Sequence, residues 1–205
     1  MLRFKIFLLL IVINNSVSAQ NVDITLLKKI NVNRFKEFDK SLNILTNTTD
    51  FTAIATPIVL LTSGFINGDA KLKKEGLNAA FSTIGTYSVG YLLKKAIDRN
   101  RPYETYTFIQ NYKVETGESF PSGSTALAFS TATSLSLSFP KWYVIVPSAI
   151  YAAGVGFSRL HLGAHYPSDV LAGAVLGVGS AFVSAKLNKL LINQHRKKSL
   201  NKSSF

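Results

Sequence analysis

Five long segments of the chain contain no Asp, Glu, Lys or Arg, and short polar stretches separate them. They cover residues 51–68, 76–93, 119–140, 142–158 and 170–185, and each is close to the roughly 20 residues that cross a bilayer as a helix. Gly, Ala, Ser and Thr recur throughout them, and small residues let membrane helices pack closely. The pattern therefore predicts an all-α fold, a bundle of about five membrane-spanning or core helices. A soluble helical protein that buries the same segments is the alternative, because the mean hydropathy is only +0.20.

The first residues have the pattern of a secretory signal peptide over 1–19. Arg3 and Lys5 precede the apolar run 6–13, and small residues lead up to Ala19, where we expect cleavage. An uncleaved membrane anchor is the alternative interpretation. It is less favoured because the apolar run is short for a membrane span.

Two further segments flank the apolar runs. Residues 20–50 carry apolar side chains at three- and four-residue steps, which predicts an amphipathic helix that caps the bundle or lies in the membrane interface. Residues 193–205 form a basic tail rich in Lys, Ser and Asn, which we expect to lack regular structure. The helical membrane domain is thus expected to occupy residues 51–192.

The charge of the chain is strongly positive and unevenly placed. The formal net charge is +12, which is common in nucleic-acid-binding proteins, but long uncharged runs have no use in such a protein, so we expect no nucleic acid partner. Lysines concentrate in the loop 71–74, at Lys141 and in the tail after residue 186. The positive-inside rule then places these three regions in the cytoplasm and the other loops outside the cell membrane. The absence of cysteine excludes disulfides and thiolate metal sites.

Three groups of chemically distinctive residues fall on the predicted outer side. They read Lys-x6-Arg-Pro over 94–102, Pro-Ser-Gly-Ser over 121–124 and Ser-Arg-x5-His-x3-Asp over 158–169. Charged groups at a membrane boundary are costly, so a cluster of them there is a functional-site hypothesis by default. Scattered charges would have fallen on both sides, and their convergence on one side predicts a single site.

These motifs resemble the three-part signature of the type-2 phosphatidic acid phosphatases, a family that shares its site with vanadium haloperoxidases. The family pattern has Pro-Ser-Gly-His in the second motif, where this chain has Ser124, and every other fixed position matches. The resemblance covers residues from about 51 to 190. It implies a helical membrane enzyme that hydrolyses lipid-linked phosphate or diphosphate, with membrane lipids around it.

The resemblance also assigns roles to the matching residues. It implies that His165 is the nucleophile, forming a phosphohistidine, and that Asp169 orients its ring. Lys94, Arg101 and Arg159 would bind the phosphate, because an arginine fork matches phosphate geometry and lysine supplies a point charge.

Two further matching residues lie at an expected helix start. Ser122 and Gly123 would place backbone N–H groups of a helix N-terminus near the anion. No metal or other cofactor is implied, since three cations meet the negative charge and the sequence contains no obvious metal-ligand cluster.

Ser124 removes the histidine that, in the family, gives a proton to the leaving group. General acid catalysis of this kind contributes about 10²–10⁴-fold, and three interpretations remain open. In the first, the protein is a slow phosphatase or one that favours substrates with an acidic leaving group, such as a diphosphate. In the second, another group, Ser124 itself or His161, substitutes as the acid. In the third, the protein binds lipid phosphate without turning it over. A vanadate-dependent peroxidase is less favoured, because those enzymes use the same missing histidine.

Overall fold

The computed structural model describes residues 21–202, with side chains described as far as residue 190, and this part of the chain is helical without strands. A helix over residues 21–31 comes first, and two short elements, η1 and α4, interrupt the connections. The remaining elements are long helices. The bounds are η1 Lys36–Phe38, α2 Asp39–Ile66, α3 Ala70–Ile97, α4 Pro102–Thr105, α5 Gly123–Ser138, α6 Trp142–His161 and α7 Pro167–Lys202. The predicted all-α fold is confirmed, and each of the five apolar segments is largely helical.

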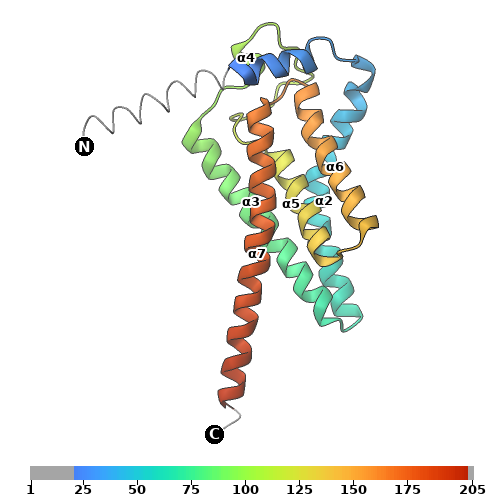
Figure 1. Cartoon of the computed structure of the whole chain (residues 1–205), viewed down its shortest axis with the longest axis vertical. Helices are drawn as coiled ribbons and strands as arrows, with labels where there is room; N and C mark the ends of the chain where they lie inside the picture. The colour runs from blue at the N-terminus through green and yellow to red at the C-terminus, as the bar shows by residue number, and fades with distance from the viewer. Residues whose placement is uncertain (1–20, 203–205) are drawn as a thin grey trace, which may run out of the picture.

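The central element of the bundle is α5, which packs against α2, α3, α6 and α7 (Figure 1). Its sequence consists of small and uncharged residues, and most of them are buried. Two glycines of α7 permit the closest of these contacts. A Cβ atom on Gly177 would lie 2.2 Å from the carbonyl oxygen of Ala126, and one on Gly173 would lie 2.6 Å from that of Ser122. The start of α7 therefore lies directly against the start of α5.

Three helical segments are long and apolar enough to cross a membrane. They are Lys36–Ile66, Trp142–His161 and Pro167–Leu190, with mean hydropathies of 1.4, 1.2 and 1.8. Sequence patterning predicted about five membrane-spanning or core helices, and α3 and α5 are the two of these helices that are not among the three candidate spans. The helix α5 has only 16 residues and is enclosed by its neighbours, whereas α3 carries lysines at both ends that lower its apolar character.

The two flanking segments differ from expectation. The helix α2 begins at Asp39, so the expected boundary at residue 50 falls inside a continuous helix. At the other end, α7 continues to Lys202, where composition predicted no regular structure. The Lys, Leu and Gln residues of this tail are good helix formers. They also continue a helix that the preceding residues have already nucleated. The predicted signal peptide lies outside the described residues.

All three motif segments converge at one end of the bundle. The chain leaves α3 and enters α5 through residues 98–122, and α6 is joined to α7 through residues 162–166. Figure 1 shows these connections at the top, around the helix 21–31, while the turn between α2 and α3 lies at the lower end. The alternation of helix directions thus brings together residues that lie far apart in the sequence.

Candidate active site

His165 lies in the short connection between α6 and α7, with its side chain almost fully buried. Its Nδ1 atom is 3.5 Å from Oδ2 of Asp169, in the first turn of α7, and 3.4 Å from the hydroxyl of Ser119. Its other ring nitrogen, Nε2, lies 3.4 Å from NH1 of Arg101. A carboxylate at Nδ1 favours the tautomer that carries its proton there. The unprotonated Nε2 therefore faces the cationic side of the site.

Asp169 is fully buried and held by several donors. The hydroxyl of Ser119 donates to Oδ2 at 2.5 Å, and the backbone N–H of Tyr166 donates to the same oxygen at 3.0 Å. The other oxygen, Oδ1, accepts a hydrogen bond from NH1 of Arg99 at 2.6 Å. These contacts fix the carboxylate so that its Oδ2 atom faces the ring of His165. Sequence reasoning missed Arg99, because it occupies a variable position between the fixed residues of the first motif.

Arg101 is a buried cation fixed by backbone carbonyls. It donates from NH1 to Ala164 at 3.0 Å, from Nε to Gly117 at 3.0 Å and from NH2 to Thr116 at 3.2 Å. Arg159, near the end of α6, is also buried, and its Nε atom has no hydrogen-bond partner among the described residues. A buried N–H group without a partner is costly, and an oxygen of a bound phosphate would satisfy it.

Glu115 bridges the two arginines. Its Oε1 lies 2.6 Å from NH2 of Arg159, and its Oε2 lies 3.8 Å from NH1 of Arg101. Burial alone would raise the pKa of this carboxyl, but the charge and hydrogen bond of Arg159 outweigh it and hold the pKa below its usual value. An anionic carboxylate thus occupies the position where two arginines would take phosphate oxygens. A single glutamate in a loop carries no spacing signal, and the sequence analysis did not identify it.

The segment 118–124 contacts Lys94 at one end and begins α5 at the other. The ammonium of Lys94 donates to the backbone carbonyl of Glu118. Ser122 is the N-cap of α5, and its backbone N–H donates to the carbonyl of Asp169 at 3.0 Å. Its hydroxyl pairs with that of Thr125 at 2.9 Å, so the fixed position supports the start of the helix. Gly123 is the first residue of α5.

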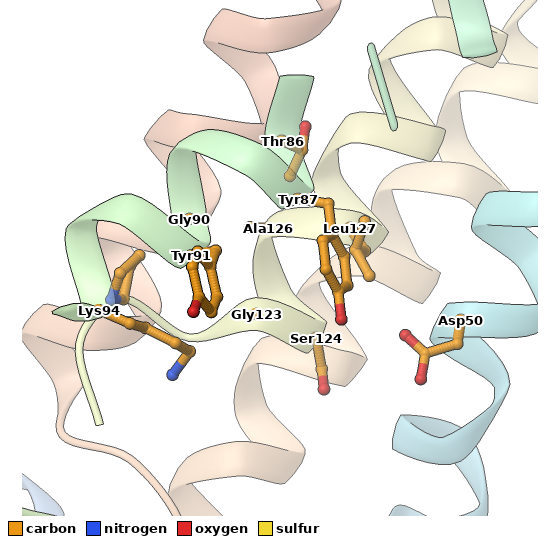
Figure 2. Close-up of a pocket in the computed structure, with 11 residues that line it drawn as sticks. Asp50, Thr86, Tyr87, Gly90, Tyr91, Lys94, Gly123, Ser124, Ala126 and Leu127 are labelled. Carbon is orange, nitrogen blue, oxygen red and sulfur yellow. The ribbon is translucent and has the colours of Figure 1, made fainter. Parts of the chain in front are cut away.

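A pocket of about 230 Å³ opens on the other side of this segment (Figure 2). Lys94, Gly123 and Ser124 line it, together with Tyr87 of α3 and Asp50 of α2. Figure 2 shows Ser124 between Lys94 and Asp50. Sequence analysis did not single out Asp50, which immediately precedes the first uncharged segment.

The structure does not bring His161 to the other site residues. Its Nε2 atom lies 3.0 Å from Oδ1 of Asp39 at the start of α2, and Arg34 holds the same carboxylate at 2.8 Å. Residues two apart on a helix face different directions, so His161 points away from Arg159. The role of substitute acid is therefore not assigned to His161.

The surroundings of His165 favour its neutral form. Burial lowers its pKa to about 4, and the nearby charges of Arg159 and Arg101 act in the same direction, against the opposing effect of Asp169. A neutral imidazole at physiological pH carries the lone pair that a nucleophile needs. Buried arginines, an oriented imidazole and an adjacent pocket together provide the positioning and charge stabilisation on which phosphoryl transfer depends.

No group of three or more His, Asp or Glu side chains within residues 21–190 is arranged to hold a metal ion.

Comparison with known proteins identifies the family to which the chain belongs. The sequence profile of the PAP2 superfamily matches residues 75–192. An undecaprenyl-diphosphatase of Sulfolobus acidocaldarius is 31% identical over 57% of this chain and 57% of its own length. A lipid A 1-phosphatase of Rhizobium johnstonii is 33% identical over 51% of this chain and 44% of its own length. The chain thus spans about half the length of these two curated relatives.

The fold has a counterpart among solved structures. The crystal structure of Aquifex aeolicus LpxE superposes with a TM-score of 0.64 at 28% identity, over 80% of this chain and 95% of that one. The similarity therefore extends beyond the matched motifs to the arrangement of the helices.

Proposed function

Because the chain belongs to the PAP2 superfamily, we propose that it is a membrane phosphatase that hydrolyses lipid-linked phosphate or diphosphate through a phosphohistidine at His165. The observation that carries the proposal is the orientation of this ring. Asp169 lies at Nδ1, while Nε2 faces the buried guanidinium of Arg101. A nucleophile with its orienting carboxylate on one side and a phosphate-binding cation on the other is what the reaction requires.

The reaction begins when substrate phosphate replaces the carboxylate of Glu115 on the arginines. Arg101 and Arg159 neutralise the non-bridging oxygens, and Lys94 adds a third positive charge near the start of α5. Nε2 of His165 attacks phosphorus, and the bond to the leaving oxygen breaks. Asp169 stabilises the positive charge that develops on the imidazole, as a carboxylate does in a Ser-His-Asp triad. Water then hydrolyses the phosphohistidine and regenerates neutral His165. No step requires a metal ion.

Ser124 favours a diphosphate over a monoester as the substrate. The leaving group of a lipid diphosphate is a phosphate, which departs with little need for a proton, whereas an alkoxide needs a general acid. The relatives carry the names of both substrate types, an undecaprenyl-diphosphatase and a lipid A 1-phosphatase. We therefore propose a polyprenyl diphosphate as the preferred class of substrate.

The site is proposed to face the extracytoplasmic side of the cell membrane. Basic residues in the first turns of α3, at Lys141 and along the end of α7 mark the opposite side as cytoplasmic. The three motif segments lie at the other end of the bundle. A single cysteine placed at residue 73 should resist an impermeant thiol reagent in intact spheroplasts, and one placed at residue 106 should react. The reverse pattern would invert the orientation.

Phosphate release by the purified full-length protein in detergent tests the activity. The substrates are a prenyl diphosphate, lipid A, phosphatidic acid and phosphatidylglycerol phosphate, each measured with and without EDTA. We expect release from the diphosphate, unaffected by EDTA and absent in His165→Ala protein. If the parent releases no phosphate from any of these lipids yet binds one tightly, the protein is a lipid-phosphate-binding homologue. Full activity in His165→Ala protein would exclude the phosphohistidine.

A further inference from the structure

We infer that Asp50 is the general base that activates water to hydrolyse the phosphohistidine, a step in which the hydroxyl of Ser124 is a poor proton acceptor. The inference rests on the proposed function and extends it by one catalytic residue. The motivating feature is the pocket beside the site, which Asp50 of α2 and Ser124 of α5 line together with Lys94 of α3 (Figure 2).

The position of Asp50 within the membrane domain sets it apart. It lies inside the segment Lys36–Ile66, which is apolar enough to span a membrane. An ionisable residue at such depth normally faces a polar cavity and serves a function. Asp23, Asp39 and Asp169 each pair with an arginine, whereas Asp50 makes no ion pair within the described residues. Its carboxylate instead lines the wall of the pocket.

The geometry of phosphoryl transfer places this pocket on the leaving-group side. The nucleophile and the leaving oxygen lie roughly in line on opposite sides of phosphorus. In the superfamily pattern a histidine at position 124 serves the leaving oxygen, and Ser124 lines the pocket with Lys94 and Gly123. Once the leaving group has departed, water enters the same space. A carboxylate on the facing helix can accept its proton there, which a serine hydroxyl does poorly.

The proposed step is balanced in atoms and charge. The oxygen of water attacks phosphorus, the P–Nε2 bond breaks, and its electron pair returns to His165. The proton of the attacking water passes to the carboxylate of Asp50. Inorganic phosphate and neutral His165 result, and the carboxyl group of Asp50 then gives its proton to solvent water.

Glu115 is another carboxylate near the site, and its contacts argue against the same role. It lies 2.6 Å from NH2 of Arg159, on the arginines that bind the phosphate oxygens. Bound phosphate therefore displaces Glu115 from the position that this carboxylate would need in order to act as the base. Asp50, on α2, makes no such contact with the arginines and remains in place when phosphate binds.

Rapid-quench kinetics with farnesyl diphosphate labelled in its terminal phosphate tests the inference on the purified full-length protein. In Asp50→Asn protein, we expect one rapid turnover to release farnesyl phosphate while the acid-labile phosphoenzyme accumulates towards one label per site. Steady-state phosphate release should fall by about 10²–10⁴-fold, the usual contribution of a general base. Hydroxylamine, which cleaves phosphohistidine directly, should restore phosphate transfer from the enzyme.

Two matched variants separate a chemical role from a structural one. Asp98→Asn makes the same change at an exposed residue whose left-handed backbone Asn adopts readily, and it should behave as the parent. Adding Ser124→His to Asp50→Asn should recover turnover, because an imidazole at that position serves as the base.

The outcomes are distinguishable. Parent-like turnover in Asp50→Asn protein overturns the role of Asp50, and so does a loss of turnover without phosphoenzyme accumulation, since the defect would then precede hydrolysis. If the parent itself forms no phosphoenzyme and releases no phosphate, the proposed function fails, and the role of Asp50 falls with it.

Discussion

Oε1 of Glu115 lies 2.6 Å from NH2 of Arg159, so a carboxylate from the loop before α5 contacts one nitrogen of the arginine that we propose binds phosphate. The two groups belong to separate segments, the connection before α5 and the end of α6. An incoming phosphate has to compete with this internal anion for the same donors.

Replacing Glu115 by Gln should therefore strengthen the binding of phosphate and of its analogue vanadate. Loss of one competing charge-assisted contact, worth about 1.5–3 kcal/mol, predicts inhibition constants lower by about tenfold or more. Inhibition of diphosphate hydrolysis by both anions measures the effect, with Glu37→Gln at the exposed η1 as the control. Weaker inhibition would show that Glu115 orders the arginines instead of competing for them.

Arg159→Lys should reduce kcat/KM by about 10²-fold or more, although the charge is kept. A lysine cannot reproduce the planar fork that engages two phosphate oxygens, and it leaves Glu115 without its partner. Steady-state kinetics with a prenyl diphosphate measures the loss. A basic residue at the other end of the bundle provides the comparison: Lys141 is exposed, and Lys141→Arg should leave kcat/KM unchanged. Equal effects of the two substitutions would remove Arg159 from the site.

The kcat/KM of the protein should persist to an unusually acidic pH. Burial and two neighbouring arginines hold the pKa of His165 at about 4 instead of 6.5, so the nucleophile stays neutral well below neutral pH. We expect kcat/KM to hold until the pH approaches that value. The same shift makes stability depend on pH: the folded state keeps its full stability above pH 6.5 and loses part of it as the pH falls through about 4, because the unfolded state takes up the proton first. A profile that falls near pH 6.5 would contradict the buried environment of His165.

Asp23 should matter for the site although it lies near the start of the described chain. Its Oδ2 accepts from NH2 of Arg99 at 2.8 Å, and its Oδ1 accepts from the backbone N–H of Ser168 at 2.8 Å. Arg99 in turn holds Asp169. Asp23→Asn should lower the unfolding free energy by about 1–3 kcal/mol and reduce kcat more than it changes KM.

Thermal unfolding in detergent and steady-state kinetics of the same preparation measure both effects. Asp98→Asn is the appropriate control, because that aspartate is exposed. Unchanged kcat in folded Asp23→Asn protein would show that the helix 21–31 does not position the catalytic pair.

Sequence spacing predicted the residues that belong to the motifs, and the structure places His165, Asp169 and Arg101 together with the start of α5. Sequence spacing could not predict Arg99, Glu115 or Asp50. Their partners lie on other segments, and which loop meets which helix end depends on packing that a linear pattern does not contain. His161 illustrates the same limit, since its position near the motif did not reveal that its ring pairs with Asp39.

Sequence patterning left open which of the five helices span the membrane and which lie in the core of the bundle. An uncharged run predicts burial, but it does not distinguish lipid from protein as the surrounding medium. The helix α5 is uncharged because four other helices enclose it. Its low content of large side chains was the available sign, since close helix contacts need small residues.

The contact of Asp23 with Arg99 and Ser168 also decides how the protein can be handled in the laboratory. The helix 21–31 lies over the end of the bundle that holds the reactive groups, whereas α7 runs to the opposite end (Figure 1). An affinity tag or fluorophore fused just before residue 21 would crowd the catalytic hydrogen bonds. The same fusion after α7 leaves them undisturbed, and it is the choice for purification and for labelling in cells.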